Sequence, residues 1–246
     1  AAMRRLARTF LLPVALYAIA FSPAHGEMDV ERLKAVIETS FEADYPKLDA
    51  LYKELHANPE LAFEEVKTAA RLAAEMRGLG FEVTEKVGKT GIVAILKNGP
   101  GPLVMVRTEL DALPMEEKTG LAYASTAKQM WNGKETFVDH SCGHDVHMAA
   151  WVGTARALVA MKDKWHGTLM FIGQPAEETT QGAKAMIADK LFERFGKPEI
   201  GFALHTGANP AGQVSYKPGV NSSNSDSLEI KFLGRGAHGS RPSQSI

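Results

Sequence analysis

Side chains that bind divalent metals recur at three places in the sequence of 246 residues. Cys142 and His144 stand two residues apart, Glu177 and Glu178 are adjacent, and His205 follows further along the chain. Thiolate, imidazole and carboxylate are the groups that bind zinc, manganese and similar ions. If these side chains meet in space, the sequence predicts a divalent-metal site.

Two adjacent glutamates suit metal-assisted hydrolysis because they can divide the work. One carboxylate can bind an ion, while its neighbour takes a proton from the attacking water and later passes it to a leaving amine. Cys142 is the single cysteine, so it has no intramolecular disulfide partner. A thiolate shared between two cations would be deprotonated and protected from oxidation, which gives this lone cysteine a function.

Several chemically active side chains lie just past an apolar run typical of a strand buried on both faces. The acidic pair Glu109 and Asp111 follows residues 103–106, the glutamate pair follows residues 168–172, and His205 follows residues 200–204. The carboxyl ends of parallel strands share one edge of a sheet, where open α/β sheets bind their ligands. Cys142 and His144 begin a predicted helix, residues 145–161, whose incoming loop reaches the same edge.

The remaining periodicity predicts the elements that hold this edge together. Apolar residues at helical spacing mark residues 48–55 and 66–76, and a further helical stretch covers 183–192. Residues 81–87 and 92–96 are typical of a hairpin that turns at 88–91. Strands that alternate with helices predict an α/β fold, with a mostly parallel twisted sheet and helices on both faces.

Composition excludes several classes of function. The 28 basic and 29 acidic side chains give a net charge of −1, so the chain offers no basic surface for nucleic acid. With 45% hydrophobic residues, the sequence belongs to a globular protein and not to a disordered or fibrous one. No G-x-G-x-x-G turn follows a predicted strand, which sets aside a dinucleotide-binding protein.

The first 26 residues are typical of a secretory signal peptide. Three arginines (Arg4, Arg5 and Arg8) precede an apolar run at 10–21, and small residues occupy positions 24 and 26. The run is shorter than the roughly 20 residues of a membrane span, although an uncleaved anchor remains the alternative. We therefore expect export to a bacterial periplasm, without membrane attachment after cleavage.

Alternatives remain open for each residue taken singly. His144 could be a helix-start residue that only forms hydrogen bonds, the glutamates a solvated pair, and His205 a semi-buried histidine. A cysteine hydrolase could use Cys142 with His144 or His147 as its base. A metal-binding or peptide-binding module without turnover would also fit. One metal site explains all of these residues together, and we prefer it for that reason.

Five short motifs, in order, resemble the amidohydrolases of peptidase family M20. The branch is that of hippurate hydrolases, N-acyl-amino-acid amidohydrolases and plant auxin-conjugate hydrolases. The resemblance runs from about Tyr45 to the last residue. The motifs are LHANPEL (55–61), DALP (111–114), CGHDVH (142–147), QPAEE (174–178) and GAHG (236–239).

The resemblance implies two divalent ions, zinc or manganese, with cobalt or nickel as alternatives. It implies that Cys142 is a thiolate shared between them. Glu177 is implied as the general base and acid, Asp111 as a carboxylate that orients a ligand, and His238 as a residue that meets the substrate carbonyl. The implied further metal ligands are His144, Glu178 and His205.

The implied activity is hydrolysis of the amide bond of an N-acyl amino acid or small peptide. Residues 27–220 are expected to be the N-terminal part of a catalytic domain. Residues 221–246 are expected to begin an inserted α+β lid domain, through which family members form homodimers. Family members continue further and return to the catalytic domain with a last metal-binding histidine. We therefore expect this sequence to be a fragment or a truncated gene product, and the 246-residue chain to be inactive.

One position departs from the family pattern. Relatives usually have aspartate two residues before Asp111, where this chain has Glu109. The extra methylene moves a carboxylate by about 1.5 Å, the length of one carbon–carbon bond. Glu109 is therefore not expected to belong to the site.

Overall fold

The computed structural model describes residues 29–220, 228, 230, 231, 240 and 243. The predicted signal peptide, His238 and most of the predicted start of the lid domain at 221–246 lie outside these residues and stay predictions. The chain divides into two units, one ending at Thr206 and the other beginning at Gly207. In the second unit, residues 207–220 form turns and irregular chain.

Five strands form the central sheet of the first unit, in the order β1-β2-β6-β3-β7. β6 pairs in parallel with β3, and β3 with β7, whereas β2 is antiparallel to both β1 and β6. All strands except β2 therefore run in one direction, which confirms the mostly parallel sheet. The strand bounds are Glu82–Val87 (β1), Gly91–Asn98 (β2), Leu103–Glu109 (β3), Gly167–Gln174 (β6) and Ile200–Ala203 (β7).

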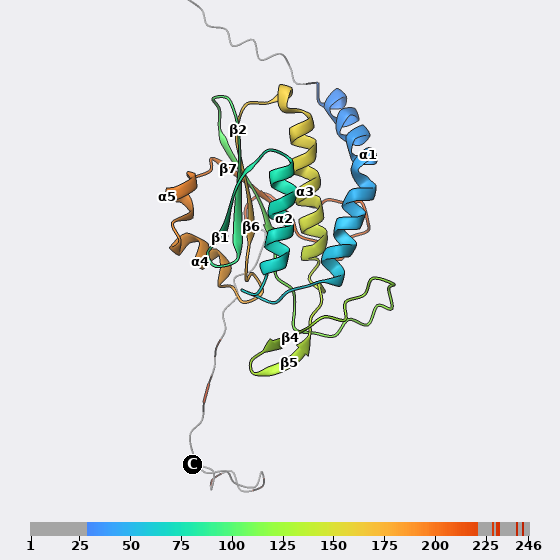
Figure 1. Cartoon of the computed structure of the whole chain (residues 1–246), viewed down its shortest axis with the longest axis vertical. Helices are drawn as coiled ribbons and strands as arrows, with labels where there is room; N and C mark the ends of the chain where they lie inside the picture. Colours follow the sequence, from blue (N-terminus) through green and yellow to red (C-terminus); the bar gives the residue numbers. More distant parts are fainter. Residues whose placement is uncertain (1–28, 221–227, 229, 232–239, 241–242, 244–246) are drawn as a thin grey trace, which may run out of the picture. The chain divides into compact units, whose positions relative to one another are not determined.

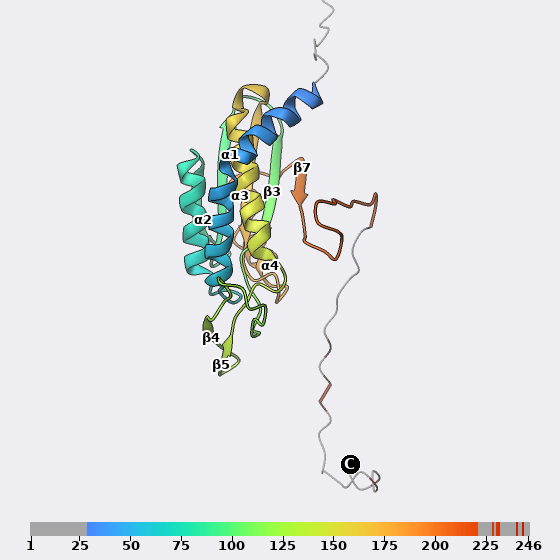
Figure 2. The ribbon, with the colours of Figure 1, turned by 90° about the vertical axis from the view of Figure 1, so that its right-hand side faces the viewer.

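Helices cover both faces of this sheet, as predicted (Figures 1 and 2). The helices on one face are α1 (Val30–Ala57), α2 (Val66–Gly78) and α3 (His144–Ala160), and those on the other are α4 (Gly182–Ala188) and α5 (Leu191–Phe195). The single helix predicted at 183–192 is thus two. Lys190 has a φ of 60° between them, a left-handed conformation that interrupts a right-handed helix.

The chain also forms elements that the sequence analysis did not predict. β4 (Lys128–Trp131) and β5 (Lys134–Phe137) make a separate hairpin, and a short 3₁₀ helix covers Lys162–Lys164. The hairpin turns at Asn132 and Gly133, both with positive φ. An Asn-Gly pair between two strands is a strong hairpin signal, so the sequence did contain the information.

The apolar run at 200–204 forms β7, but the prediction that this strand is buried is wrong. Ile200 and Phe202 are 50% and 60% exposed. β7 is the edge of the described sheet and pairs only with β3 there. An apolar run reports a tendency toward burial, and the neighbours decide whether burial occurs.

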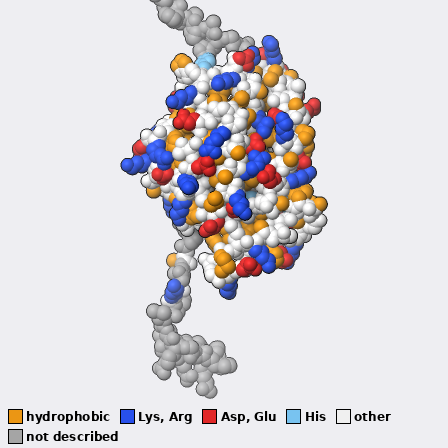
Figure 3. All heavy atoms as spheres, in the orientation of Figure 1, with side chains coloured by type: hydrophobic (Ala, Val, Ile, Leu, Met, Phe, Trp, Pro, Cys, Tyr) orange, Lys and Arg blue, Asp and Glu red, His pale blue; other side chains and the backbone are white. Residues whose placement is uncertain are grey.

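The surface of the described residues agrees with the balanced composition. Basic and acidic side chains are interspersed over the face shown in Figure 3. Among the helices that the structure describes, none combines the length and the apolar character needed to span a bilayer.

Phe171 on β6 lies at the centre of the main core, which joins the sheet to α2 and α3. Its ring packs edge to face against Phe81 and Trp151, with centroids 5.4 and 5.3 Å away. We expect Phe171→Ala to lower the free energy of unfolding by about 3–5 kcal/mol, the usual cost of such a cavity. Urea denaturation would measure this, with the half-exposed Phe41→Ala as control, for which the loss should stay within about 0.5 kcal/mol.

Glu75 on α2 pairs with two arginines, Arg71 on the same helix and Arg156 on α3. Its carboxylate lies 2.7 Å from both the Arg71 and the Arg156 guanidinium groups. Burial raises the pKa of Glu75, but the two guanidinium groups outweigh this and hold the pKa below its ordinary value of 4.5.

We expect Glu75→Gln to cost about 1.5 kcal/mol at neutral pH. Because the pKa of Glu75 is lower in the folded state, its contribution is complete above pH 4.5 and disappears as the pH falls through the folded-state pKa. Urea unfolding at pH 7 and near pH 3 would therefore show a shrinking difference between variant and wild type. A constant difference would contradict the assignment.

Candidate metal centre

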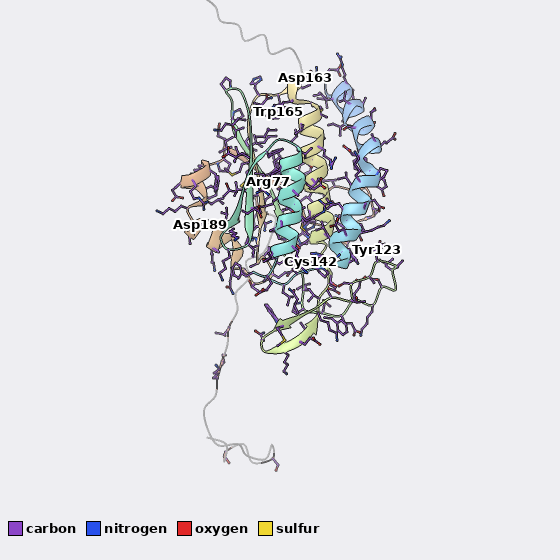
Figure 4. The ribbon with its side chains drawn as sticks, viewed as in Figure 1. Arg77, Tyr123, Cys142, Asp163, Trp165 and Asp189 are labelled. Atoms are coloured by element: carbon purple, nitrogen blue, oxygen red, sulfur yellow. The ribbon has the colours of Figure 1, made fainter. Side chains whose placement is uncertain are left out.

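The side chains predicted to bind metal come together at one edge of the sheet. The ends of β3, β6 and β7 bring Asp111, the Glu177–Glu178 pair and His205 to the N-terminal end of α3. Figure 4 shows Cys142 at that end of α3. Gly143 precedes the helix with a φ of 81°, and a Cβ there would come within 2.4 Å of Thr206 Oγ1. Glycine thus allows the segments that carry Cys142 and His205 to approach closely.

His144 is the common member of the groups that could hold an ion. Its ligand atom and those of Cys142 and His205 lie within 4.8 Å of one another, and the same holds for His144 with Glu177 and Glu178. Cys142 Sγ is 3.5 Å from His205 Nε2. His144 Nε2 is 3.8 Å from an oxygen of each glutamate. The structure thus brings all four predicted metal ligands and the predicted base together.

Several of these polar atoms are buried and have no hydrogen-bond partner among the residues that the structure describes. They are His144 Nε2, Glu178 Oε1 and Asp111 Oδ1. Buried polar atoms are nearly always paired, so three unpaired ones in one cluster need an explanation. A divalent cation would accept electron pairs from imidazole nitrogen and carboxylate oxygen atoms of this kind. The residues present therefore fit a metal centre.

Asp111 contacts both His144 and Glu178, the first through its main-chain carbonyl and the second through its carboxylate. His144 Nδ1 donates to the main-chain carbonyl of Asp111 at 2.7 Å, which leaves Nε2 to face the cluster. The Asp111 carboxylate is 3.7 Å from His144 Nδ1. It instead accepts a hydrogen bond of 2.9 Å from the backbone N–H of Glu178. His144 is thus oriented by the main-chain carbonyl of Asp111, while the Asp111 carboxylate accepts a hydrogen bond from the backbone of Glu178.

The structure also places Glu109 and His147 in the cluster, although the sequence analysis left Glu109 out. The backbone N–H of Thr206 donates to His147 Nε2 at 2.8 Å. That nitrogen is therefore an acceptor, so Nδ1 carries the proton and donates to Glu109 at 3.0 Å. His147 thereby holds the residue next to His205. The spacing of His144 and His147 on one helix face was the available signal.

The environment of Cys142 argues against a free nucleophilic thiolate. Burial, together with the carboxylates of Glu178, Glu177 and Glu109, raises the pKa of Cys142 to about 12. A cysteine hydrolase needs the opposite shift. A nearby divalent cation would reverse the effect and deprotonate the thiol.

Glu177 has the properties of a group that exchanges protons. Its side chain is 36% exposed, which leaves it accessible from solvent. Burial and the carboxylates of Glu178, Asp111 and Glu109 raise the pKa of Glu177, although His144 opposes them. A carboxyl group with a raised pKa can take up and release a proton nearer to neutral pH.

Comparison with known proteins agrees with this fold. The sequence pattern of peptidase family M20/M25/M40 matches residues 105–243. Hippurate hydrolase of Campylobacter jejuni is 38% identical over 198 residues, which cover 80% of this chain and 49% of that enzyme. N-acetylcysteine deacetylase of Bacillus subtilis is 32% identical over 213 residues, which cover 83% and 52%.

A solved structure shows the same relationship. A dinuclear metal-binding peptidase of the M20 family from Bacillus subtilis superposes with a TM-score of 0.60 and is 32% identical. The match covers 68% of this chain and 44% of that one. The chain thus combines a mixed α/β fold with a cluster of potential metal ligands at the carboxyl edge of its sheet. The chain belongs to peptidase family M20/M25/M40, and it spans about half the length of the relatives it matches.

Proposed function

We propose that the protein to which this chain belongs is a dinuclear metal-dependent amidohydrolase that cleaves the amide bond of N-acyl amino acids or small peptides. The unpaired Nε2 of buried His144, which faces both glutamates, carries this proposal. The relative named hippurate hydrolase acts on hippurate, which is an N-acylated amino acid. It supports the substrate class.

Cys142, His144, Glu178 and His205 would hold the two ions. Bound divalent ions supply Lewis-acid polarisation of the amide carbonyl and lower the pKa of water. Glu177 takes a proton from the attacking water as the C–O bond forms. It then gives that proton to the amide nitrogen as the C–N bond breaks, so that a carboxylic acid and an amine leave.

The test is hydrolysis of hippurate and N-acetyl amino acids by the full-length protein after loading with zinc or manganese. We expect turnover that a chelator abolishes and that added metal restores. Turnover insensitive to the chelator but abolished by thiol alkylation would favour the cysteine hydrolase. Metal binding without turnover of any substrate would favour the binding module.

We also propose that the mature protein is exported and dimerises through its lid domain. Export is supported by the leader pattern at residues 1–26. Dimerisation is supported by the family motif around His238. Size measurement of the full-length protein in solution, and its recovery from the periplasm, would test these two proposals.

A further inference from the structure

Glu65 is a fully buried carboxylate that takes no part in the metal cluster. It lies in the loop before α2. One of its oxygens accepts hydrogen bonds from the backbone N–H groups of Phe63 and Ala176, at 2.9 and 2.8 Å. The other oxygen accepts from the Thr90 hydroxyl in the β1–β2 turn. Glu65 therefore joins three segments that are far apart in the sequence, and one of them carries the proposed base.

All three of these donors are uncharged. Burial raises the pKa of Glu65, although its hydrogen bonds oppose that effect. A carboxylate so deeply buried carries a desolvation cost that an apolar side chain would avoid. The hydrogen bonds that Glu65 accepts are therefore the property that needs an explanation. Two of the three come from backbone N–H groups.

Ala176 is the residue immediately before Glu177, and both of its backbone polar groups are fixed. Its N–H donates to Glu65, and its carbonyl accepts hydrogen bonds from the backbone N–H groups of Gln181 and Gly182, at 3.2 and 3.0 Å. Ala176 has a φ of 46°, in the left-handed region that a residue with a Cβ rarely adopts. Such a conformation persists only where its surroundings hold it.

We propose that Glu65 is a positioning residue that fixes, through Ala176, the turn from which Glu177 reaches the substrate. The inference rests on the proposed function of Glu177 and adds to it a residue outside the metal cluster. Asp111 fixes the same turn from the other side, through the backbone of Glu178. The general base is thus held from both flanks.

The test compares variants that remove different parts of this arrangement in the full-length enzyme. Glu65→Ala should lower kcat by about 100-fold, the usual effect of misplacing a catalytic group by 1 Å, with KM and bound metal unchanged. Thr90→Val removes a bond to Glu65 but leaves the one to Ala176, so kcat should stay within about twofold. Glu64→Ala, an exposed neighbour, is the matched control. Unchanged kcat in Glu65→Ala, or an equal loss in Thr90→Val, would overturn the proposal.

Two more conservative substitutions keep the proposal testable if the Glu65→Ala variant does not fold. Glu65→Gln preserves the length and the acceptor for Ala176, whereas Glu65→Asp preserves the charge but withdraws the oxygens by one methylene. We expect Glu65→Gln to retain much more kcat than Glu65→Asp. The reverse order would show that charge, and not the bond to Ala176, is what matters.

Amide hydrogen exchange in the metal-free protein separates this proposal from the proposed function. Exchange at Ala176 should be at least about tenfold faster in Glu65→Asp than in wild type, and unchanged in Thr90→Val and Glu64→Ala. If the wild type hydrolyses nothing, the proposed function fails, but faster exchange would still support Glu65 as the residue that fixes this turn. Unchanged exchange would overturn that conclusion whether or not the enzyme is active.

Discussion

Glu177→Gln is expected to lower kcat of the full-length enzyme by about 100-fold to 10,000-fold, the range that general acid–base groups supply. The amide of glutamine has the shape of the carboxylate but cannot take a proton from water. Because Glu177 is not among the four proposed ligands, bound metal should remain at the wild-type level. Measuring kcat and metal content on one preparation tests both statements.

The adjacent residue provides the matched control for that experiment. Glu178→Gln alters a proposed ligand whose oxygen is buried and unpaired, so it should release metal as well as lower kcat. If Glu177→Gln released metal and Glu178→Gln did not, the two glutamates would have exchanged roles. Full activity in Glu177→Gln would remove it as the base.

The location of the site was predictable because it follows from topology. Parallel strands deliver whatever follows them to one edge, so strand ends alone placed Asp111, the glutamate pair and His205 together. The strands themselves were recognisable as short apolar runs, although β3 continues to Glu109 and β6 to Gln174. Strand ends are set by pairing with neighbours, which a single segment does not encode.

The finer structure of the site was less predictable, because it depends on main-chain groups and side-chain reach. The amino-acid sequence does not indicate that a main-chain carbonyl will orient His144. Nor does it indicate that a backbone N–H will donate a hydrogen bond to His147. Glu109 was left out because its extra methylene changes its reach, yet that reach brings it to His147. Glu65 carried no signal, since an acidic residue in a loop is usually exposed.

The burial of α1 and β7, at the two ends of the first unit, was also hard to predict from the sequence. Most of α1 lies outside the helical segment predicted at 48–55, because residues such as Val36 and Phe41 are exposed and leave no clear apolar stripe. β7 shows the converse, an apolar run that is exposed at the edge of the sheet. The hydrophobic pattern of a segment indicates which side chains could be buried. The elements that pack against the segment determine which ones are buried.

Cys142→Ser is expected to lower metal affinity by at least about 100-fold, beyond the usual effect of losing a residue that only supports a ligand. Its Sγ lies beside His205 Nε2 in the ligand cluster, and a serine hydroxyl stays protonated where a thiol would become a thiolate. Mass spectrometry of metal content in the full-length protein should give close to two ions per wild-type chain and far fewer in the variant. Ser141→Ala, an exposed neighbour of Cys142, is the matched control and should keep both ions.

The number of ions in this experiment distinguishes between explanations of the unpaired atoms around His144. Two ions lost together in Cys142→Ser would mean that one thiolate serves both, since two independent sites would lose one ion each time a ligand is removed. One weakly held ion in the 246-residue wild-type chain, and two in the full-length protein, would mean that a further ligand comes from outside this sequence. Two ions retained in Cys142→Ser would contradict the shared thiolate. The raised pKa of Cys142 would then describe an ordinary buried thiol.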